Sequence, residues 1–336
     1  MIDFRSDTVT KPSREMMEEM MKAPVGDDVF GEDPSINELQ DYAAELFGME
    51  AALFCPSGTM TNQIAIMVHT QPGDEVICHK DAHIYMYEGG GIARNAGASV
   101  RLLDGARGMF TASDLETAVN PADSHFSRTS LVAVENTTNR GGGACYSLSE
   151  IEEIAAFCKE RGLKLHLDGA RLFNALVRTK AKPEQYGALF DSISICLSKG
   201  LGAPVGSLLL GSKEFIQEAH RCRKVMGGGM RQAGGLAAAG LYALKNNVER
   251  LVLDHKNAGT VGDVLNKQAW VRSVWAIETN IVIVELKEGE SEQVWCEKLK
   301  ENGVLCIPFG KGLIRFVTHL DISEKQMAQF KELDLE

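Results

Sequence analysis

The stretch Leu165-His166-Leu167-Asp168-Gly169-Ala170-Arg171, followed by Cys196-Leu197-Ser198-Lys199-Gly200, decides the fold. The first run predicts a short buried strand with a carboxylate at its carboxyl end. The second predicts an apolar strand that delivers a lysine into a glycine-rich turn. Ligands bind at the carboxyl ends of parallel strands. An aspartate and a lysine at that edge suit an enzyme that uses pyridoxal 5'-phosphate (PLP), in which the carboxylate keeps the pyridine nitrogen protonated and the amine carries the aldehyde as a Schiff base.

The middle of the chain alternates short apolar runs with segments of helical character. Ser147 and Ser149, each with a glutamate three residues later, are helix-start signals before the helical segment 151–161. Short strands separated by helices predict the α/β class, with a mainly parallel sheet that is covered on both faces. The expected strands are residues 51–55, 75–78, 130–135, 164–167, 191–197 and 206–210.

The pattern changes near residues 246–247. A long charged helix over 248–267 leads into two apolar runs, 280–286 and 313–319, which bracket a helical stretch at 292–302. This order predicts a smaller α+β domain at the C-terminus. The expected organisation is an N-terminal arm (1–15) that contributes to the active site, a large PLP-binding domain (16–247) and a small domain (248–336).

Composition narrows the class of protein. The 336 residues carry 46 acidic and 35 basic side chains, a net charge of −11, which argues against a nucleic-acid or anionic-membrane surface. The eight cysteines include no Cys-x-x-Cys pair, so we expect no metal site. We expect the cysteines to be reduced thiols in a cytoplasmic protein. The start resembles no signal peptide, and no apolar run approaches the ~18 residues that span a bilayer.

Each candidate residue also has an ordinary structural interpretation. Ser57-Gly58-Thr59 ends a strand and opens a helix, which makes either a phosphate cradle or a capped turn. Asp168 could cap a helix and Lys199 could be a surface lysine, although the apolar run before Lys199 favours burial. Arg171 could bind the cofactor phenolate or a substrate carboxylate, or neutralise Asp168. His83 and His125 are candidate ring-stacking or proton-transfer groups, and structural histidines are the alternative.

Several longer motifs, spread over nearly the whole chain, resemble the low-specificity L-threonine aldolases, PLP enzymes of the aspartate-aminotransferase-like fold (fold type I). That resemblance implies a mainly parallel, seven-stranded sheet in the large domain. The motifs are Asp3-Phe4-Arg5-Ser6-Asp7-Thr8-Val9-Thr10, Gly26-Asp27-Asp28-Val29-Phe30-Gly31, Pro56-Ser57-Gly58-Thr59, Asp168-Gly169-Ala170-Arg171, Leu197-Ser198-Lys199-Gly200-Leu201-Gly202, Gly227-Gly228-Gly229-Met230-Arg231-Gln232 and Arg315-Phe316-Val317-Thr318-His319.

The resemblance also implies roles for single residues. Lys199 would form the internal aldimine, Asp168 would pair with the pyridine nitrogen and His83 would stack on the ring. Ser57, Gly58 and Thr59 would hold the cofactor phosphate. Three groups would bind the substrate carboxylate, and His125 would lie near the substrate hydroxyl. The residues that would bind the substrate carboxylate are Ser6, Arg171 and Arg315. A loop would bring Lys224 and Arg231 close to the active site.

The implied reaction is reversible retro-aldol cleavage of L-threonine, L-allo-threonine and related β-hydroxy-α-amino acids to glycine and an aldehyde. The alternative is another fold type I reaction, namely β-elimination, transamination or racemisation. The family also implies a homodimer or a dimer of dimers with active sites at the subunit interface. Two residues depart from its pattern: Phe30 stands where tyrosine is frequent, in a segment expected at that interface, and Thr138 replaces a histidine.

Overall fold

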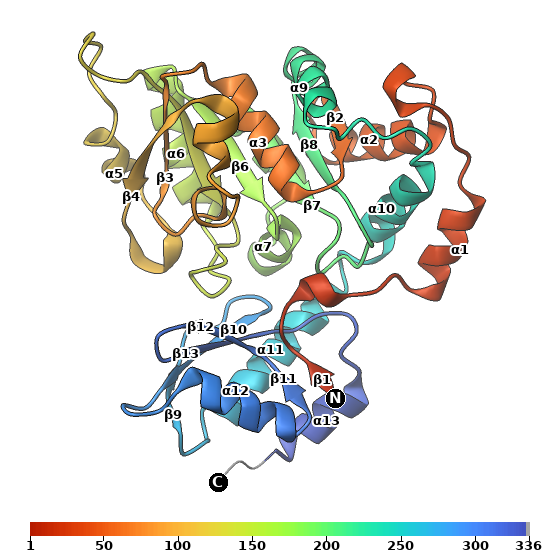
Figure 1. The fold of residues 1–336 in the computed structure, drawn as a ribbon, viewed down its shortest axis with the longest axis vertical. Coiled ribbons are helices and arrows are strands. Elements are labelled where there is room, and N and C mark those ends of the chain that lie inside the picture. The colour runs from red at the N-terminus through yellow and green to blue at the C-terminus, as the bar shows by residue number, and fades with distance from the viewer. Residues whose placement is uncertain (334–336) are drawn as a thin grey trace.

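The computed structural model describes residues 1–333. The protein has two lobes, which are joined by the N-terminal segment and by residues 247–250, the link between helices α10 and α11 (Figure 1). The larger lobe is built on a seven-stranded sheet in the order β2-β8-β7-β6-β5-β3-β4. Its strands are β2 (Ala51–Cys55), β3 (Glu75–His79), β4 (Ser99–Leu103), β5 (Thr129–Glu135), β6 (Lys164–Gly169), β7 (Ser192–Cys196) and β8 (Ser207–Gly211).

The sheet is mainly parallel, as expected. β3 pairs in parallel with β4 and β5, and the parallel pairing continues through β6 to β7, whereas β8 runs antiparallel to both β7 and β2. The expected runs located six of these strands within one or two residues at each end. β4 was missed because its edge position leaves Arg101 and its neighbours exposed, so it lacks the continuous apolar run of a buried strand.

Helices cover both faces of this sheet (Figure 1). The helix that follows β5 begins at the expected place, where Ser147 and Glu150 form a reciprocal cap. The helices of the larger lobe are α1 (Arg14–Lys22), α2 (Pro34–Phe47), α3 (Gly58–His69), α4 (His83–Met86), α5 (Ala112–Glu116), α6 (Leu148–Arg161), α7 (Leu172–Thr179), α8 (Pro183–Gly187), α9 (Lys213–Val225) and α10 (Gly234–Asn246).

The smaller lobe is α+β, with an antiparallel sheet in the order β12-β13-β10-β9. The expected segments 248–267, 280–286, 292–302 and 313–319 appear as α11, β10, α12 and β13. The elements of this lobe are α11 (Leu251–Leu265), β9 (Val271–Val274), β10 (Ile281–Leu286), α12 (Glu292–Glu301), β11 (Val304–Leu305), β12 (Ile307–Gly310), β13 (Leu313–Val317) and α13 (Glu324–Lys331).

The N-terminal segment belongs structurally to the smaller lobe before it reaches the larger one. β1 (Ile2–Asp3) pairs in parallel with β11, and Phe4 packs edge-on against Phe316 and Phe330 in that lobe's core. The chain then passes between the lobes as a short 3-10 turn, Asp7–Val9. The N-terminal segment is therefore far in sequence from the smaller lobe, although its residues Ile2 and Phe4 belong to the core of that lobe.

The expected boundary at residues 247–248 falls in the link between α10 and α11, and the last three residues of the expected 248–336 domain lie outside the described part. Within residues 1–333, no helix has the length and apolar character needed to cross a membrane.

Candidate active site

A pocket of about 520 Å³ opens where the two lobes meet. Its walls carry residues from the N-terminal segment, from the ends of several strands of the large sheet and from β12 and β13 of the smaller lobe. The lining includes five residues that the sequence indicated, namely Ser6, His83, Arg171, Lys199 and Arg315. Residues from the two ends of the chain thus contribute to one cavity.

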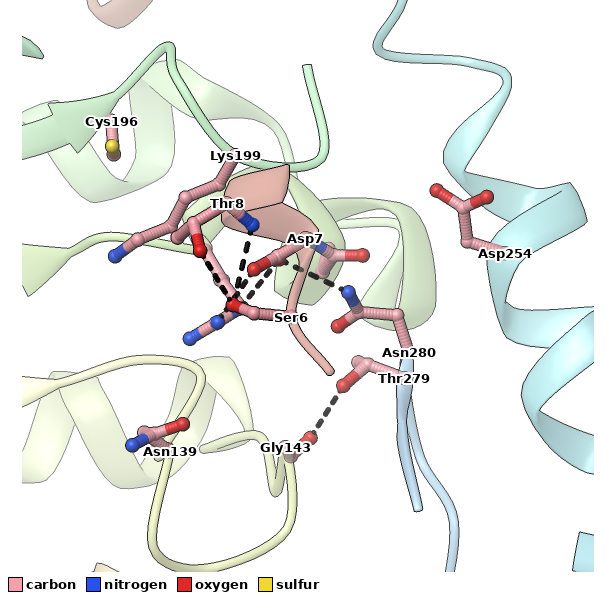
Figure 2. Close-up of polar contacts among 12 residues, drawn as sticks. Ser6, Asp7, Thr8, Asn139, Gly143, Cys196, Lys199, Asp254, Thr279 and Asn280 are labelled. Carbon is pink, nitrogen blue, oxygen red and sulfur yellow. Dashed lines mark hydrogen bonds and ion pairs between the residues drawn. The ribbon is translucent and has the colours of Figure 1, made fainter. Parts of the chain in front are cut away.

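Lys199 lies in the turn after β7, and its side chain reaches the pocket (Figure 2). Its carbonyl oxygen accepts hydrogen bonds from the Thr10 hydroxyl at 3.0 Å and from the Gly202 N–H at 2.8 Å, which fixes the backbone. Gly202 has a φ of +79°, and a Cβ there would lie 2.5 Å from Leu320. This glycine leaves room for the side chain of Leu320.

Asp168 occupies the carboxyl end of β6 and is buried. Its Oδ1 accepts the Ala170 N–H at 3.1 Å, and its Oδ2 accepts the Asn62 side-chain amide at 3.0 Å. The same amide nitrogen donates to Glu88 at 2.9 Å, while the Asn62 oxygen lies 3.1 Å from His166 Nε2. These contacts hold the carboxylate without a cationic side chain, so its charge is available to a cationic ring.

Arg171 is neutralised by Asp7 of the N-terminal segment, not by Asp168 as one interpretation had it. Two parallel hydrogen bonds of 2.7 Å join Arg171 Nε and Nη2 to the Asp7 carboxylate, and both side chains are buried. Asn280 donates a further hydrogen bond to Asp7 at 3.2 Å (Figure 2). Burial alone would raise the pKa of Asp7, but the charge and hydrogen bonds of Arg171, with the Lys199 charge, hold that pKa well below its usual range.

Replacing Asp7 by asparagine is expected to lower the free energy of unfolding by about 3 kcal/mol, because it leaves the buried Arg171 charge unpaired. The depressed pKa of Asp7 contributes stability above the unfolded-state pKa, and that contribution is lost as the pH falls through the folded-state value. Denaturant unfolding at neutral pH and in acid should therefore show the difference shrinking in acid. Asp3→Asn, which breaks the solvent-exposed pair with Arg5, should change stability by under ~1 kcal/mol; an equal loss in both variants would contradict the argument.

Arg315 is buried but lacks an anionic partner among the described residues. Its Nη1 donates to Asn139 Oδ1 at 2.8 Å and its Nη2 to the Arg5 carbonyl at 3.3 Å, while its Nε is buried without a hydrogen bond to residues 1–333. Burial, with the nearby Arg171 charge, lowers the pKa of Arg315 to about 10. A buried guanidinium in this state is suited to receive an anion from the pocket.

His83 begins α4 and faces three carboxylates. Its backbone N–H donates to Glu135 Oε2 at 2.7 Å, and its Nδ1 lies 3.0 Å from Glu88 Oε1. Burial, together with the Asp168 charge, raises the pKa of Glu135 to about 7. Donor atoms of His83, Glu88 and Asp168 lie within 4.8 Å of one another, a spacing that a metal ion could bridge. The Asn62 amide already donates to both Glu88 and Asp168, and the expectation that no metal is bound stays a prediction.

The Ser57-Gly58-Thr59 turn has the geometry of a capped helix start with spare donors. Ser57 caps α3 by accepting the Met60 N–H, and neither Gly58 nor Thr59 uses its own N–H in a hydrogen bond to the described residues. The buried Ser207 hydroxyl also lacks a partner within residues 1–333, and a Cβ on Gly58 would lie 3.5 Å from it. These free donors at the positive end of a 12-residue helix suit a phosphate group.

Seven residues of the sequence hypothesis do not line this pocket. Four of them, Asp168 and the Ser57-Gly58-Thr59 turn, are described above, and the other three are His125, Lys224 and Arg231. The His125 side chain is 86% exposed on the loop between α5 and β5, where its Nδ1 lies 2.7 Å from Asp123. Lys224 ends α9 and is exposed, and Arg231 pairs with Asp27 at 2.8 Å. His125 does not line the pocket of one chain, because its loop after α5 is exposed to solvent. Its expected place near the substrate hydroxyl stays a prediction.

The two departures from the family pattern have different settings. Phe30 is 73% exposed, next to the segment that carries Arg231, so its ring could only be covered by something outside this chain. Thr138 is buried and donates to the Arg107 carbonyl at 2.9 Å. A Cβ at Gly141 would lie 2.3 Å from its hydroxyl, so the Thr138 side chain packs closely against a position that has room only for glycine. Thr138 does not line the pocket.

Sequence reasoning missed the residues that support the site without standing at a strand end. Asp7 lies inside one of the family motifs, and its place there was the signal that could have identified it. Asn62 gave no signal because helices commonly carry amides on solvent faces, and Glu88 gave none because it lies in the turn after α4, where a charged residue is ordinary. Glu135 ends a strand that the sequence did locate and is paired in register with Asp168, so its register neighbour could have identified it.

The chain is similar in sequence and in fold to known proteins. A family model described as beta-eliminating lyase matches residues 3–288. Low specificity L-threonine aldolase from Escherichia coli (strain K12) is 46% identical over 330 residues, covering 98% of this chain and 97% of that protein. Leishmania major threonine aldolase has a TM-score of 0.85 at 24% identity, covering 99% of this chain and 98% of that one. A Thermus thermophilus protein named as a probable N-succinyldiaminopimelate aminotransferase has a TM-score of 0.69 at 19% identity, covering 99% and 94%. The two structures, each below 25% identity, confirm the aminotransferase-like fold.

Proposed function

Because the chain belongs to the beta-eliminating lyase family and matches a low-specificity L-threonine aldolase almost end to end, we propose that it is a PLP-dependent threonine aldolase. The reaction is the reversible cleavage of L-threonine, L-allo-threonine and related β-hydroxy-α-amino acids to glycine and an aldehyde. The proposal includes a cytoplasmic enzyme that works as a homodimer or dimer of dimers.

The observation that carries the proposal is that one pocket is lined both by Lys199 and by Arg315, a buried arginine without an anionic partner among the described residues. An amino acid brings a carboxylate for Arg315, and its amine would compete with the Lys199 amine for the aldehyde of the cofactor. The spare Nη1 of Arg171, which donates to no residue of the described chain, and the Ser6 hydroxyl offer further donors. Few other small molecules carry both an amine that can replace a lysine amine on an aldehyde and a carboxylate for a buried arginine.

The residues present also fit PLP. Lys199 supplies the amine for the aldehyde, Asp168 supplies the buried carboxylate for the ring nitrogen, and the free N–H groups of Gly58 and Thr59 supply phosphate donors, beside the unpartnered Ser207 hydroxyl. When bound, PLP takes up the electron pair that the substrate releases at Cα. Lys224 and Arg231 would reach that group only through a rearrangement of their loop or from a second subunit.

Holding the substrate carboxylate sets which bond at Cα breaks. A clamp made by Ser6, Arg171 and Arg315 fixes the rotation of the substrate about Cα, and only a bond in the correct orientation can transfer its electrons. The β-hydroxyl then needs a base. His83 lines the pocket and can serve. His125 remains a candidate only if a second subunit places its loop over the pocket, which is consistent with the proposed oligomer.

A second candidate reaction is β-elimination, because the matching family is named for it. Serine would then give pyruvate and ammonia in place of glycine and formaldehyde. The two reactions share the lysine, the carboxylate clamp and the base, so the products distinguish them. Pyruvate as the main product from serine would favour elimination.

The test of the proposal is direct. Purified protein with added PLP and L-allo-threonine should release acetaldehyde and glycine in equal amounts, well above the PLP-only background. Coupled reduction of acetaldehyde by an alcohol dehydrogenase measures the rate. The same protein given glycine and acetaldehyde should form threonine, since the pathway is reversible. If neither direction exceeds the background, the chain is not an aldolase.

A further inference from the structure

The structure assigns to Glu88 the role of a positioning residue, which holds His83 with its Nε2 free to accept the β-hydroxyl proton of the substrate. The assignment rests on the proposed function for the identity of that proton. It concerns a residue with no signal in the sequence, in a pair of side chains that share one buried contact.

Glu88 is arranged as an acceptor with all its partners inside the protein. Its side chain has no exposed surface, and its Oε1 lies 3.0 Å from His83 Nδ1 and 2.9 Å from the Asn62 amide nitrogen. Its Oε2 accepts from the Gln63 amide at 2.6 Å. No lysine or arginine within residues 1–333 pairs with it, so His83 is its one cationic partner there.

These contacts determine where the proton of His83 sits. An ionised carboxylate only accepts hydrogen bonds, so the nitrogen that faces Glu88 must carry the hydrogen. The lone pair of neutral His83 then belongs to Nε2, the nitrogen not bonded to Glu88. The His83 side chain is 32% exposed and lines the pocket, so its free nitrogen is accessible to a substrate. A buried carboxylate that orients an imidazole in this way is a general device for base catalysis.

The glycine triplet at positions 89–91, directly after Glu88, leaves room for a residue that holds its carboxylate. Gly89 and Gly90 adopt φ angles of +63° and +73°, in the left-handed region that favours glycine. A Cβ on Gly91 would lie 2.4 Å from the side-chain oxygen of Gln63, whose amide nitrogen donates to the second carboxylate oxygen of Glu88. The absence of a side chain at Gly91 therefore supplies the space that the Gln63–Glu88 contact requires.

The charges around His83 come from four elements. Glu88 follows α4, Asp168 lies on β6, Glu135 on β5 and Lys199 after β7. Burial lowers the pKa of His83, but the Glu88 hydrogen bond and the charges of Asp168 and Glu88 outweigh burial and the Lys199 charge, so the pKa is raised. His83 is thus a stronger base than an ordinary histidine, and its neutral form is lost at a higher pH.

Each electron pair and the proton have a destination in this step. His83 Nε2 takes the proton from the β-hydroxyl, and the O–H electron pair forms the C=O bond of the departing aldehyde as Cα–Cβ breaks. The electron pair of the Cα–Cβ bond would pass to the cofactor that the proposed function requires. The cation that forms on His83 is neutralised by Glu88 through Nδ1. On reversal, the same imidazolium returns the proton to the new hydroxyl.

Glu88→Gln tests the assignment, since it keeps the size of the side chain and removes its charge. We expect kcat for L-allo-threonine to fall about 10²-fold, at the lower end of what a general base contributes, with KM changed much less. The acidic limb of the kcat–pH profile should move to lower pH, because the pKa of His83 falls without the carboxylate. Glu75→Gln, at a buried glutamate that begins β3 at the amino ends of the parallel strands, is the matched control and should leave the limb in place.

A readout without catalysis separates this inference from the proposed function. Nitrogen-15 NMR of histidine-labelled, cofactor-free protein, with His83→Asn to identify the signal, should show the Nδ1–H tautomer for neutral His83. If the wild-type protein makes no acetaldehyde, the proposed function fails while this tautomer can still be found. An Nε2–H tautomer in the wild type, or an active Glu88→Gln enzyme with an unmoved acidic limb, overturns the role of Glu88. The wild-type spectrum decides even if the variant does not fold.

Discussion

Lys199→Ala should reduce the cleavage of L-allo-threonine by about 10³-fold or more and abolish the absorbance near ~420 nm that marks PLP bound as a Schiff base. The reason is covalent: Lys199 lines the pocket, and under the proposed function its amine would bind the aldehyde of PLP, whereas alanine has no nucleophile. Absorbance spectroscopy after PLP addition and gel filtration measures attachment, and the acetaldehyde assay measures turnover. Loss of both signals in a folded variant is the expected result.

Two further variants make this result specific. Lys199→Arg keeps the positive charge beside Asp7 but cannot form the link, so it should behave like the alanine variant in both assays while preserving the charge balance of the buried Asp7–Arg171 pair. Lys300→Ala, at an exposed lysine of α12 paired with Glu297, should change neither signal. A yellow, active Lys199→Arg protein would mean that another lysine carries the cofactor.

Asp168→Asn should lower kcat by roughly 10²- to 10³-fold while PLP still binds. Asp168 is buried and has no cationic side chain within the described chain bonded to it, so its charge is free to stabilise a protonated ring nitrogen. Asparagine removes that charge. It also has a single oxygen for the two donors that Asp168 now accepts, the Ala170 N–H and the Asn62 amide, so a loss of about 1–3 kcal/mol in stability accompanies the change.

Steady-state kinetics at saturating PLP, with denaturant unfolding of the same preparations, separates the two effects. Asp191→Asn is the control, because Asp191 lies just before β7, at the amino ends of the parallel strands and away from the pocket. There it accepts the Leu165 N–H and pairs with Lys164. That variant should lose stability without a comparable loss of kcat. Equal kcat losses in the two variants would show that Asp168 acts through stability alone.

Local patterns predicted the parts of the fold that depend on neighbours in sequence. Continuous apolar runs located β5, β6 and β7, since buried parallel strands need no polar face. The cap at Ser147 predicted the start of α6 because a cap is satisfied within a few residues. The same patterns failed for β4, which lies at the sheet edge and carries a charged, exposed surface.

Pairings over long distances were outside the reach of such patterns. Arg171 was expected to bind a ligand or to neutralise Asp168. It does line the pocket, but its carboxylate partner is Asp7, 164 residues away, because the N-terminal segment passes between the lobes. Glu88 and Asn62 became interpretable only when the turn after α4 was seen against α3. The side chain of His125 lies on an exposed loop and contacts only Asp123 in its own segment, so neither its sequence nor a single subunit defines its surroundings.

By itself, the amino-acid order determined that a carboxylate and a lysine end two neighbouring buried strands, because hydrophobic burial and chain direction force those side chains to the same edge of a parallel sheet. Tertiary structure alone decided which charges are neutralised and which remain open, namely that Asp7 occupies Arg171 while Arg315 has no anion within the described residues. The reason is physical: an ion pair depends on separation in space, and the chain brings residues 7, 171 and 315 together only after both lobes have folded.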